Sequence, residues 1–388
     1  MSTEPAAAHT AVATAMALLR RGDARAALEA LDAAQASDPA NAELRVHKAL
    51  AHRALGNIPE ALVELDAAIA LDPYHFLAQL SKGALLERVG RPRAAASVYR
   101  IALKIAPPAD KLPPALLSPL QRAREVAATD AEALAVHLRE KLGPVRARNN
   151  TDDFRRMDEC LDVAAGTRRV FNAEPVLLHV PRLPAIPFFD RALFPWFADL
   201  EAATATIREE LLPLLAGDMP EFAPYVAYSA GTPVNQFAQL NHSRLWSSYW
   251  LWRDGERQEE AIARCPRTAE LLSGLPMADQ PHFAPTALFS ALAPHTRIPP
   301  HCGSTNARLL VHLPLVLPGP AGFRVGNETR QWRLGEAWAF DDTIEHEAWN
   351  DADALRVILI FDIWNPLLTP AERESITCVL SARADWYR

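Results

Sequence analysis

The chain has 388 residues, of which 49% are hydrophobic and 22% charged, an ordinary composition for a soluble protein of two or three domains. Its formal net charge of −7 argues against nucleic acid as a principal partner. No apolar run approaches the roughly 18 residues of a membrane span, and the N-terminus lacks the pattern of a signal peptide. The cysteines are far apart and predict reduced thiols, so we expect a cytoplasmic protein (Cys160, Cys265, Cys302 and Cys378).

The N-terminal part of the chain is predicted to be an α-solenoid built from an internal repeat. Glycine and proline both recur every 34 residues, at Gly22, Gly56 and Gly90 and at Pro39, Pro73 and Pro107. This period, with small residues where two helices cross, is the signature of the tetratricopeptide repeat (TPR). We expect a flexible segment over residues 1–8 and three TPR-like helical hairpins over residues 9–107.

The concave face of such a solenoid usually binds an extended peptide or a partner protein. We therefore expect the repeats to help bind a peptide or protein substrate. The alternative is that they serve only as a spacer or as a platform for oligomerisation. The sequence leaves the oligomeric state open.

A helical connector is predicted over residues 108–167, and a mixed domain over residues 168–388. Good helix formers dominate residues 116–142, and residues 149–152 predict a loop and a helix cap. An irregular, proline-rich segment precedes a helix at about residues 200–215. The next segment carries polar and aromatic side chains that either line a pocket or pack in the core, with core packing favoured (His242, Trp246, Trp250 and Trp252).

Short strands follow each other in the C-terminal part of the chain, with no helical period between them. They are rich in β-branched or aromatic residues and are expected at residues 309–317, 322–325, 337–340 and 355–363. This pattern predicts a closed, jelly-roll-like architecture, in which distant residues meet inside the mouth. His301 and His346 suit a first-row divalent metal such as iron there, and Arg356 suits a bidentate contact with a carboxylate.

Four phrases in this region resemble the aspartyl/asparaginyl β-hydroxylase family of iron(II)- and 2-oxoglutarate-dependent oxygenases. They are Pro300-His301-x-Gly303-x-Thr305-Asn306-x-Arg308-Leu309-x-x-His312-Leu313, Gly326-Asn327-Glu328-Thr329 with Trp332, Phe340-Asp341-Asp342-x-x-Glu345-His346-Glu347-x-Trp349, and Asp362-x-Trp364-x-Pro366. The resemblance implies a double-stranded β-helix, of the jelly-roll or cupin type, buttressed by helices. The whole chain is then an α+β multidomain protein.

The resemblance also implies which residues form the site. His301 and His346 are the expected iron ligands. Arg356 is expected to bind the distal carboxylate of 2-oxoglutarate, with Ser290 and His312 assisting.

Two positions concern how complete this site is. Family members often have an arginine where this chain has Leu310, so either the affinity for 2-oxoglutarate is lower or Arg308 partly takes that role. Gly303 stands where most of the wider superfamily has a carboxylate ligand, as it does in the hydroxylase family. Water then fills the vacated position, and Asp342 is a candidate for orienting that water.

The residues and the resemblance together predict a dioxygenase that uses iron(II), 2-oxoglutarate and O2 to hydroxylate an unactivated carbon. The expected target is the β-carbon of Asp or Asn in a peptide or protein. The alternatives are a hydroxylase of small molecules or lipids whose repeats only mediate oligomerisation, a halogenase, and a non-catalytic TPR adaptor. His282 and His295 have no support as further ligands from spacing or resemblance.

Overall fold

The computed structural model describes residues 4–149 and 154–387. The chain divides into two compact units, Met1–Arg169 and Val170–Arg388. Among the described residues, no helix is both long enough and apolar enough to cross a membrane.

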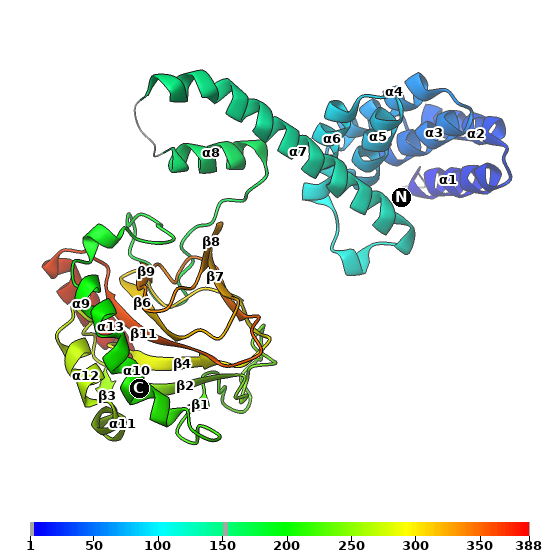
Figure 1. Ribbon diagram of the computed structural model, residues 1–388. Helices are drawn as coiled ribbons and strands as arrows, with labels where there is room; N and C mark the ends of the chain where they lie inside the picture. The colour runs from blue at the N-terminus through cyan, green and yellow to red at the C-terminus, as the bar shows by residue number, and fades with distance from the viewer. Residues whose placement is uncertain (1–3, 150–153, 388) are drawn as a thin grey trace. The chain divides into compact units, whose positions relative to one another are not determined.

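In the described residues of the first unit, all regular secondary structure is helical (Figure 1). Three hairpins form from its first six helices: α1 (Glu4–Arg20), α2 (Ala24–Ser37), α3 (Ala42–Ala54), α4 (Ile58–Leu71), α5 (Phe76–Arg88) and α6 (Pro92–Ile105). The repeat alanines Ala27, Ala61 and Ala95 are fully buried where the two helices of a hairpin pack together. The repeat glycines end the first helix of each hairpin with a positive φ, a conformation that glycine adopts without strain. The structure therefore has the predicted helical repeats.

Helix boundaries in this unit differ from the predicted ones at two places. The first helix begins at Glu4, inside the segment expected to be flexible, whereas residues 1–3 lie outside the described part of the chain. After a short 3-10 turn (Ala109–Lys111), α7 runs over Pro114–Arg148, beyond the predicted end at residue 142 and past Pro144. The loop and cap predicted at residues 149–152 fall largely outside the described residues. Helix α8 follows at Arg155–Ala165.

The second unit is built on two antiparallel sheets, which agrees with the predicted α+β architecture and its jelly-roll-like part. The larger sheet has the order β1-β2-β4-β11-β6-β9, with β3 beside β2, and the smaller has the order β5-β10-β7-β8. The strands of the larger sheet are β1 (Ala223–Pro224), β2 (Trp246–Arg253), β3 (Glu256–Arg257), β4 (Ala287–Leu292), β6 (Arg308–Val316), β9 (Trp338–Phe340) and β11 (Arg356–Trp364). Those of the smaller sheet are β5 (Thr296–His301), β7 (Ala321–Val325), β8 (Glu328–Gln331) and β10 (His346–Asn350).

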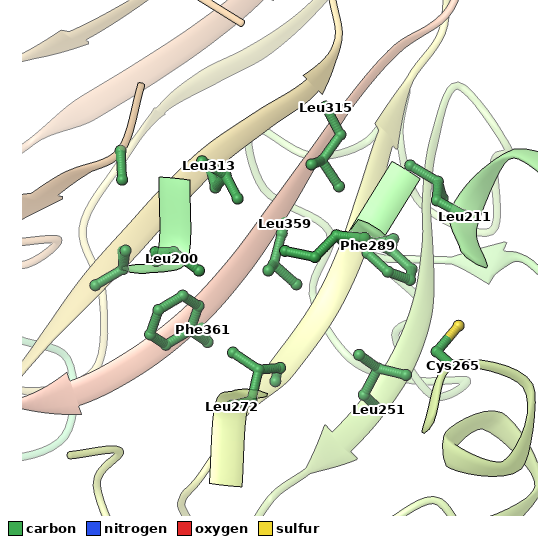
Figure 2. Close-up of a cluster of buried hydrophobic side chains, with 14 of the residues drawn as sticks. Leu200, Leu211, Leu251, Cys265, Leu272, Phe289, Leu313, Leu315, Leu359 and Phe361 are labelled. Atoms are coloured by element: carbon green, nitrogen blue, oxygen red, sulfur yellow. The ribbon is translucent and has the colours of Figure 1, made fainter. Parts of the chain in front are cut away.

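Helices cover one face of the larger sheet, as expected from the family resemblance. They are α9 (Phe197–Ala202), α10 (Thr204–Leu214), α11 (Glu259–Arg264) and α12 (Pro266–Ser273); α13 (Pro370–Trp386) ends the chain, and a short 3-10 turn (Arg191–Leu193) precedes α9. Figure 2 shows Leu200, Leu211 and Leu272 of these helices in one cluster with Phe289 and Leu359 of the sheet. Burying each such side chain contributes about 1.5–3 kcal/mol.

The alternation of side chains along the strands separates this core from the inside of the fold. On β11, Val357, Leu359 and Phe361 pack in the helix-covered core. The intervening residues, which include Ile358 and Ile360, face the space between the two sheets. The candidate site residues Ser290 on β4, His312 on β6 and Arg356 on β11 face the same space.

Candidate functional site

The two histidines lie side by side. His301 ends β5 and His346 begins β10, and the antiparallel register of these strands pairs the two residues directly. Their ring centroids are 4.1 Å apart, with an angle of 54° between the ring planes. The strand pairing therefore brings together two side chains that are distant in sequence.

Backbone carbonyl groups set the tautomer of both rings. His301 Nδ1 lies 2.7 Å from the carbonyl oxygen of Pro299, and His346 Nδ1 lies 3.0 Å from that of Ile344. Because a carbonyl oxygen only accepts, each Nδ1 carries the proton and donates it, which leaves the lone pair on Nε2. Burial lowers the pKa of His301, and burial together with the nearby His301 ring lowers that of His346. Both rings are thus kept neutral, the form that binds a metal.

A cavity of about 80 Å³ begins at these histidines and extends between the sheets. Most of its walls are apolar: Leu288, Ile298, Leu310, Phe323, Phe340, Ala348, Ile358 and Ile360. Its polar lining comes mainly from His301, His346, Ser290, His312 and Arg356. Five of the six residues predicted for the site therefore line one cavity.

Arg356 is the unusual member of this set. Its side chain is only 1% exposed, no salt bridge to it is found in the described part of the chain, and its Nε and Nη1 atoms lack hydrogen-bond partners. Burial lowers the pKa of the guanidinium to about 9. The guanidinium lies 5.4 Å from the ring centroid of Trp332, which offers a cation–π contact but no counter-charge.

His312 and Ser290 lie in the same cavity. His312 Nδ1 is buried without a partner, and burial, Arg356 and His346 together hold the pKa of this ring well below its usual value. The His312 ring stacks on Trp332 at 5.5 Å. The Ser290 hydroxyl accepts a hydrogen bond from Trp246 Nε1 at 3.0 Å, so its own proton remains available for another acceptor.

Arg308 does not line the cavity and has a different partner from the one expected. It donates to Asp362 Oδ2 at 2.6 Å and to the carbonyl oxygen of Phe283 at 2.8 Å. Burial raises the pKa of Asp362 to about 6 against the opposing effect of Arg308. Two residues further along β6, it is Leu310 that faces the cavity, so the wall there is apolar.

Asp342 explains why position 303 is a glycine. A Cβ atom at Gly303 would overlap the Asp342 carboxylate, and Gly303 N donates to the Asp342 carbonyl oxygen at 2.7 Å. Burial raises the pKa of this carboxyl group to about 7. The Asp342 carboxylate thus occupies the space that a side chain at position 303 would need.

The aromatic residues near the site divide between pocket and core. Trp246 lines the cavity, whereas Trp252 packs in the helix-covered core as predicted. Tyr225 also lines the cavity and was missed, because only its pairing next to β2 brings it there. His242, His282 and His295 are exposed and do not line the cavity.

Comparisons with known proteins agree with this architecture. The family model for aspartyl/asparaginyl beta-hydroxylase matches residues 201–366, and the model for tetratricopeptide repeats matches residues 12–76 and 48–110. The chain is 34% identical over 204 residues to the ornithine lipid ester-linked acyl 2-hydroxylase of Rhizobium tropici, which covers 51% of this chain and 68% of that protein. It is 40% identical over 135 residues to human aspartyl/asparaginyl beta-hydroxylase, covering 34% of this chain but only 18% of the human protein.

Among solved structures, the TPR2B domain of yeast Sti1 matches 33% of this chain and 98% of its own, with 20% identity and a TM-score of 0.29. The fold, the sequence matches and the cavity define a jelly-roll domain preceded by helical repeats. This chain belongs to the aspartyl/asparaginyl β-hydroxylase family.

Proposed function

We propose that this protein is an iron(II)- and 2-oxoglutarate-dependent oxygenase that hydroxylates an unactivated carbon. One observation carries the proposal: a fully buried arginine without a counter-ion lies in the same cavity as two neutral, paired histidines. Such a cavity fits a small dianion that reaches from a metal to the guanidinium.

The histidine pair fits a ferrous ion. Nε2 is the free nitrogen on both His301 and His346, and the carbonyl contacts at Nδ1 hold the rings in orientation, as partners of metal-bound histidines commonly do. Two imidazoles leave several coordination positions for oxygen ligands, which iron accepts. The Asp342 carboxylate fills the space beside Gly303, and we propose that it orients the water molecule at the position where other oxygenases have a carboxylate ligand. With 2-oxoglutarate and O2, iron would supply the oxidising power for hydroxylation, releasing succinate and carbon dioxide.

The opposite part of the cavity fits the distal carboxylate of 2-oxoglutarate. An uncompensated buried charge costs several kcal/mol, so the guanidinium of Arg356 gains strongly from a carboxylate partner. Its unpaired N–H groups suit a fork-like contact, and the buried Nδ1 of His312 and the hydroxyl of Ser290 supply further polar atoms. The apolar walls exclude water and strengthen these contacts. Arg308 is engaged with Asp362, so Arg356 alone supplies the positive charge.

The direct test is 2-oxoglutarate turnover with purified, iron-loaded protein. We expect succinate to form, and we expect His301→Ala to abolish it. Arg356→Ala should chiefly raise the 2-oxoglutarate concentration required, because the histidines remain. Near-native turnover in the histidine variant would contradict the assignment.

We propose that the repeats recruit a polypeptide substrate through a groove of about 810 Å³. Its lining includes the apolar side chains of Met16, Val46, Leu50, Leu77, Leu80 and Leu116. Two exposed arginines on its lining, Arg53 and Arg88, have no salt-bridge partner in the described part of the chain, whereas Arg122 is paired with Glu87. A groove with these features suits a segment that combines apolar and acidic side chains.

Charge reversal tests this recruitment. The double variant Arg53→Glu with Arg88→Glu should weaken binding of such peptides and raise KM without changing kcat. Arg93→Glu is the matched control, because Arg93 is exposed on α6 but does not line the groove. An equal effect of the control would count against the groove.

An acyl chain is the second candidate substrate. The apolar side chain of Leu310 favours it, because it leaves Arg356 as the only cation that lines the cavity among the described residues. We assign Arg356 to the cosubstrate. A substrate carboxylate near the histidines then lacks a cationic partner, whereas an apolar chain fits the walls. Incubation with cell extract, followed by mass mapping of added oxygen atoms in peptides and in lipids, separates the two candidates.

A further inference from the structure

An aromatic stack leads from the histidine pair toward the surface. The Trp246 ring centroid lies 6.4 Å from that of His301. Tyr225 stacks on Trp246 at 3.9 Å with an interplanar angle of 14°, and on Trp250 at 5.7 Å with an angle of 19°. Three oxidisable rings therefore follow each other in van der Waals or near contact.

Strand pairing builds this stack. Trp246 and Trp250 lie on the same face of β2, because they are an even number of residues apart. Tyr225 directly follows β1, which pairs with β2, and its N–H donates to the Trp246 carbonyl oxygen at 2.9 Å. The tyrosine ring is thereby held between the two indoles.

Tyr225 and Trp250 are both more exposed than Trp246. Trp246 is 5% exposed and its indole N–H is fixed by Ser290, whereas Tyr225 is 37% exposed and Trp250 is partly exposed. The guanidinium of Arg253, a side chain 62% exposed, covers Trp250 at 5.2 Å. One end of the stack therefore reaches the site and the other reaches solvent.

The remaining rings that contact the histidines are phenylalanines. Phe237 contacts His301 at 5.2 Å, and Phe340 and Phe323 contact His346 at 5.5 and 5.8 Å. Phenylalanine gives up an electron far less readily than indole or phenol does. Trp332 and Trp338 contact Phe323 on its far side. Both indoles are buried, and in the described part of the chain neither has a ring contact with His301 or His346.

We propose that Trp246, Tyr225 and Trp250 form an electron-transfer path that protects the site when no substrate carbon is in place. This proposal rests on the oxygenase function proposed above. When 2-oxoglutarate is decarboxylated but no carbon is hydroxylated, one oxygen atom of O2 remains unused at the site. Its reduction to water requires two electrons. Each electron passes from Trp250 through Tyr225 and Trp246 to the site.

The balance closes with a reductant of the ascorbate or thiol class. Trp250 loses one electron to the site and its indole N–H proton to solvent, and the reductant returns one electron and one proton. Two such rounds, with two protons taken up at the site, convert the unused oxygen atom to water. The indole N–H bond of Trp250 is broken and re-formed in each round, so the protein is unchanged overall when the reductant is present. Without it, the oxidised indole of Trp250 reacts further with O2 or water and acquires oxygen.

The test incubates full-length, iron-loaded protein with 2-oxoglutarate and O2, without other substrate or reductant. Electron paramagnetic resonance of frozen samples and mass mapping of added oxygen are both recorded. We expect an aromatic radical during turnover and added oxygen at Trp250, both suppressed by ascorbate. Trp250→Phe should lose the oxidation at this position, shift it to Tyr225 and Trp246, and shorten the lifetime of the enzyme several-fold. Trp386→Phe is the control, because this indole is 83% exposed at the end of α13 and outside the stack.

The outcomes separate this proposal from the function beneath it. If no succinate forms, the oxygenase assignment fails. If succinate forms but no radical appears, and oxygen is added only near the histidines, the path is refuted. Equal lifetimes of the wild type, Trp250→Phe and Trp386→Phe would also overturn it.

Discussion

Replacing Arg356 with methionine should make the ligand-free second unit more stable. Burial lowers the pKa of this guanidinium from its ordinary value to about 9, which corresponds to about 5 kcal/mol of lost solvation. Because the folded-state pKa is lowered, the penalty is fully present below about pH 9 and is relieved as the pH rises above that value toward the ordinary pKa of arginine. Methionine fills a similar volume without charge, and replacing even paired buried charges by apolar residues can stabilise by about 1–4 kcal/mol.

Tryptophan fluorescence during urea unfolding is a suitable assay. All 9 tryptophans of the chain lie after residue 195, so the signal reports the second unit alone. At neutral pH, wild-type protein should gain about 3 kcal/mol from 2-oxoglutarate at 100 times its Kd, whereas Arg356→Met should gain none. A methionine variant that is less stable than the ligand-free wild type, yet still stabilised by 2-oxoglutarate, would refute the reasoning.

Other substitutions test separate parts of the site. His346→Ala should abolish binding of ferrous ion in calorimetry while leaving the repeats folded by circular dichroism; retained stoichiometric binding would exclude this residue as a ligand. Arg308→Met should lower the free energy of unfolding in urea by about 3–5 kcal/mol, because it leaves the buried carboxylate of Asp362 without its ion-pair partner. The Kd for 2-oxoglutarate should not change. A large rise in that Kd would restore the role first expected of Arg308. Gly303→Ala should displace the Asp342 carboxylate and lower both stability and turnover. Unchanged unfolding and turnover in this variant would show that the carboxylate has room to move.

The repeats and the histidine pair could both be predicted from the sequence, but for different physical reasons. A period of 34 residues predicts the solenoid because each hairpin packs on its neighbours, so the signal is local. His301 and His346 were identified by motif, and the β5–β10 register supplies their proximity. Helix α7 continues past Pro144, although the sequence predicted that the helix ends at residue 142.

Contacts between strands distant in sequence could not be read from the residues. Arg308 and Asp362 meet because β6 pairs with β11, and no local pattern predicts that register. Tyr225 is brought to the cavity by the pairing of β1 with β2. Side-chain alternation on β4 is the signal that was available, since it places Ser290 on the cavity face and Phe289 in the core.

The central claim is that the paired histidines and Arg356 hold iron and 2-oxoglutarate together. Anaerobic titration of ferrous ion into protein containing 2-oxoglutarate, followed by the absorption of a ferrous 2-oxo acid chelate, measures this directly. We predict one chelate per chain in the wild type, none in His346→Ala, and a chelate in Arg356→Met only at much higher 2-oxoglutarate concentration. The same titration curve for all three proteins would contradict the account.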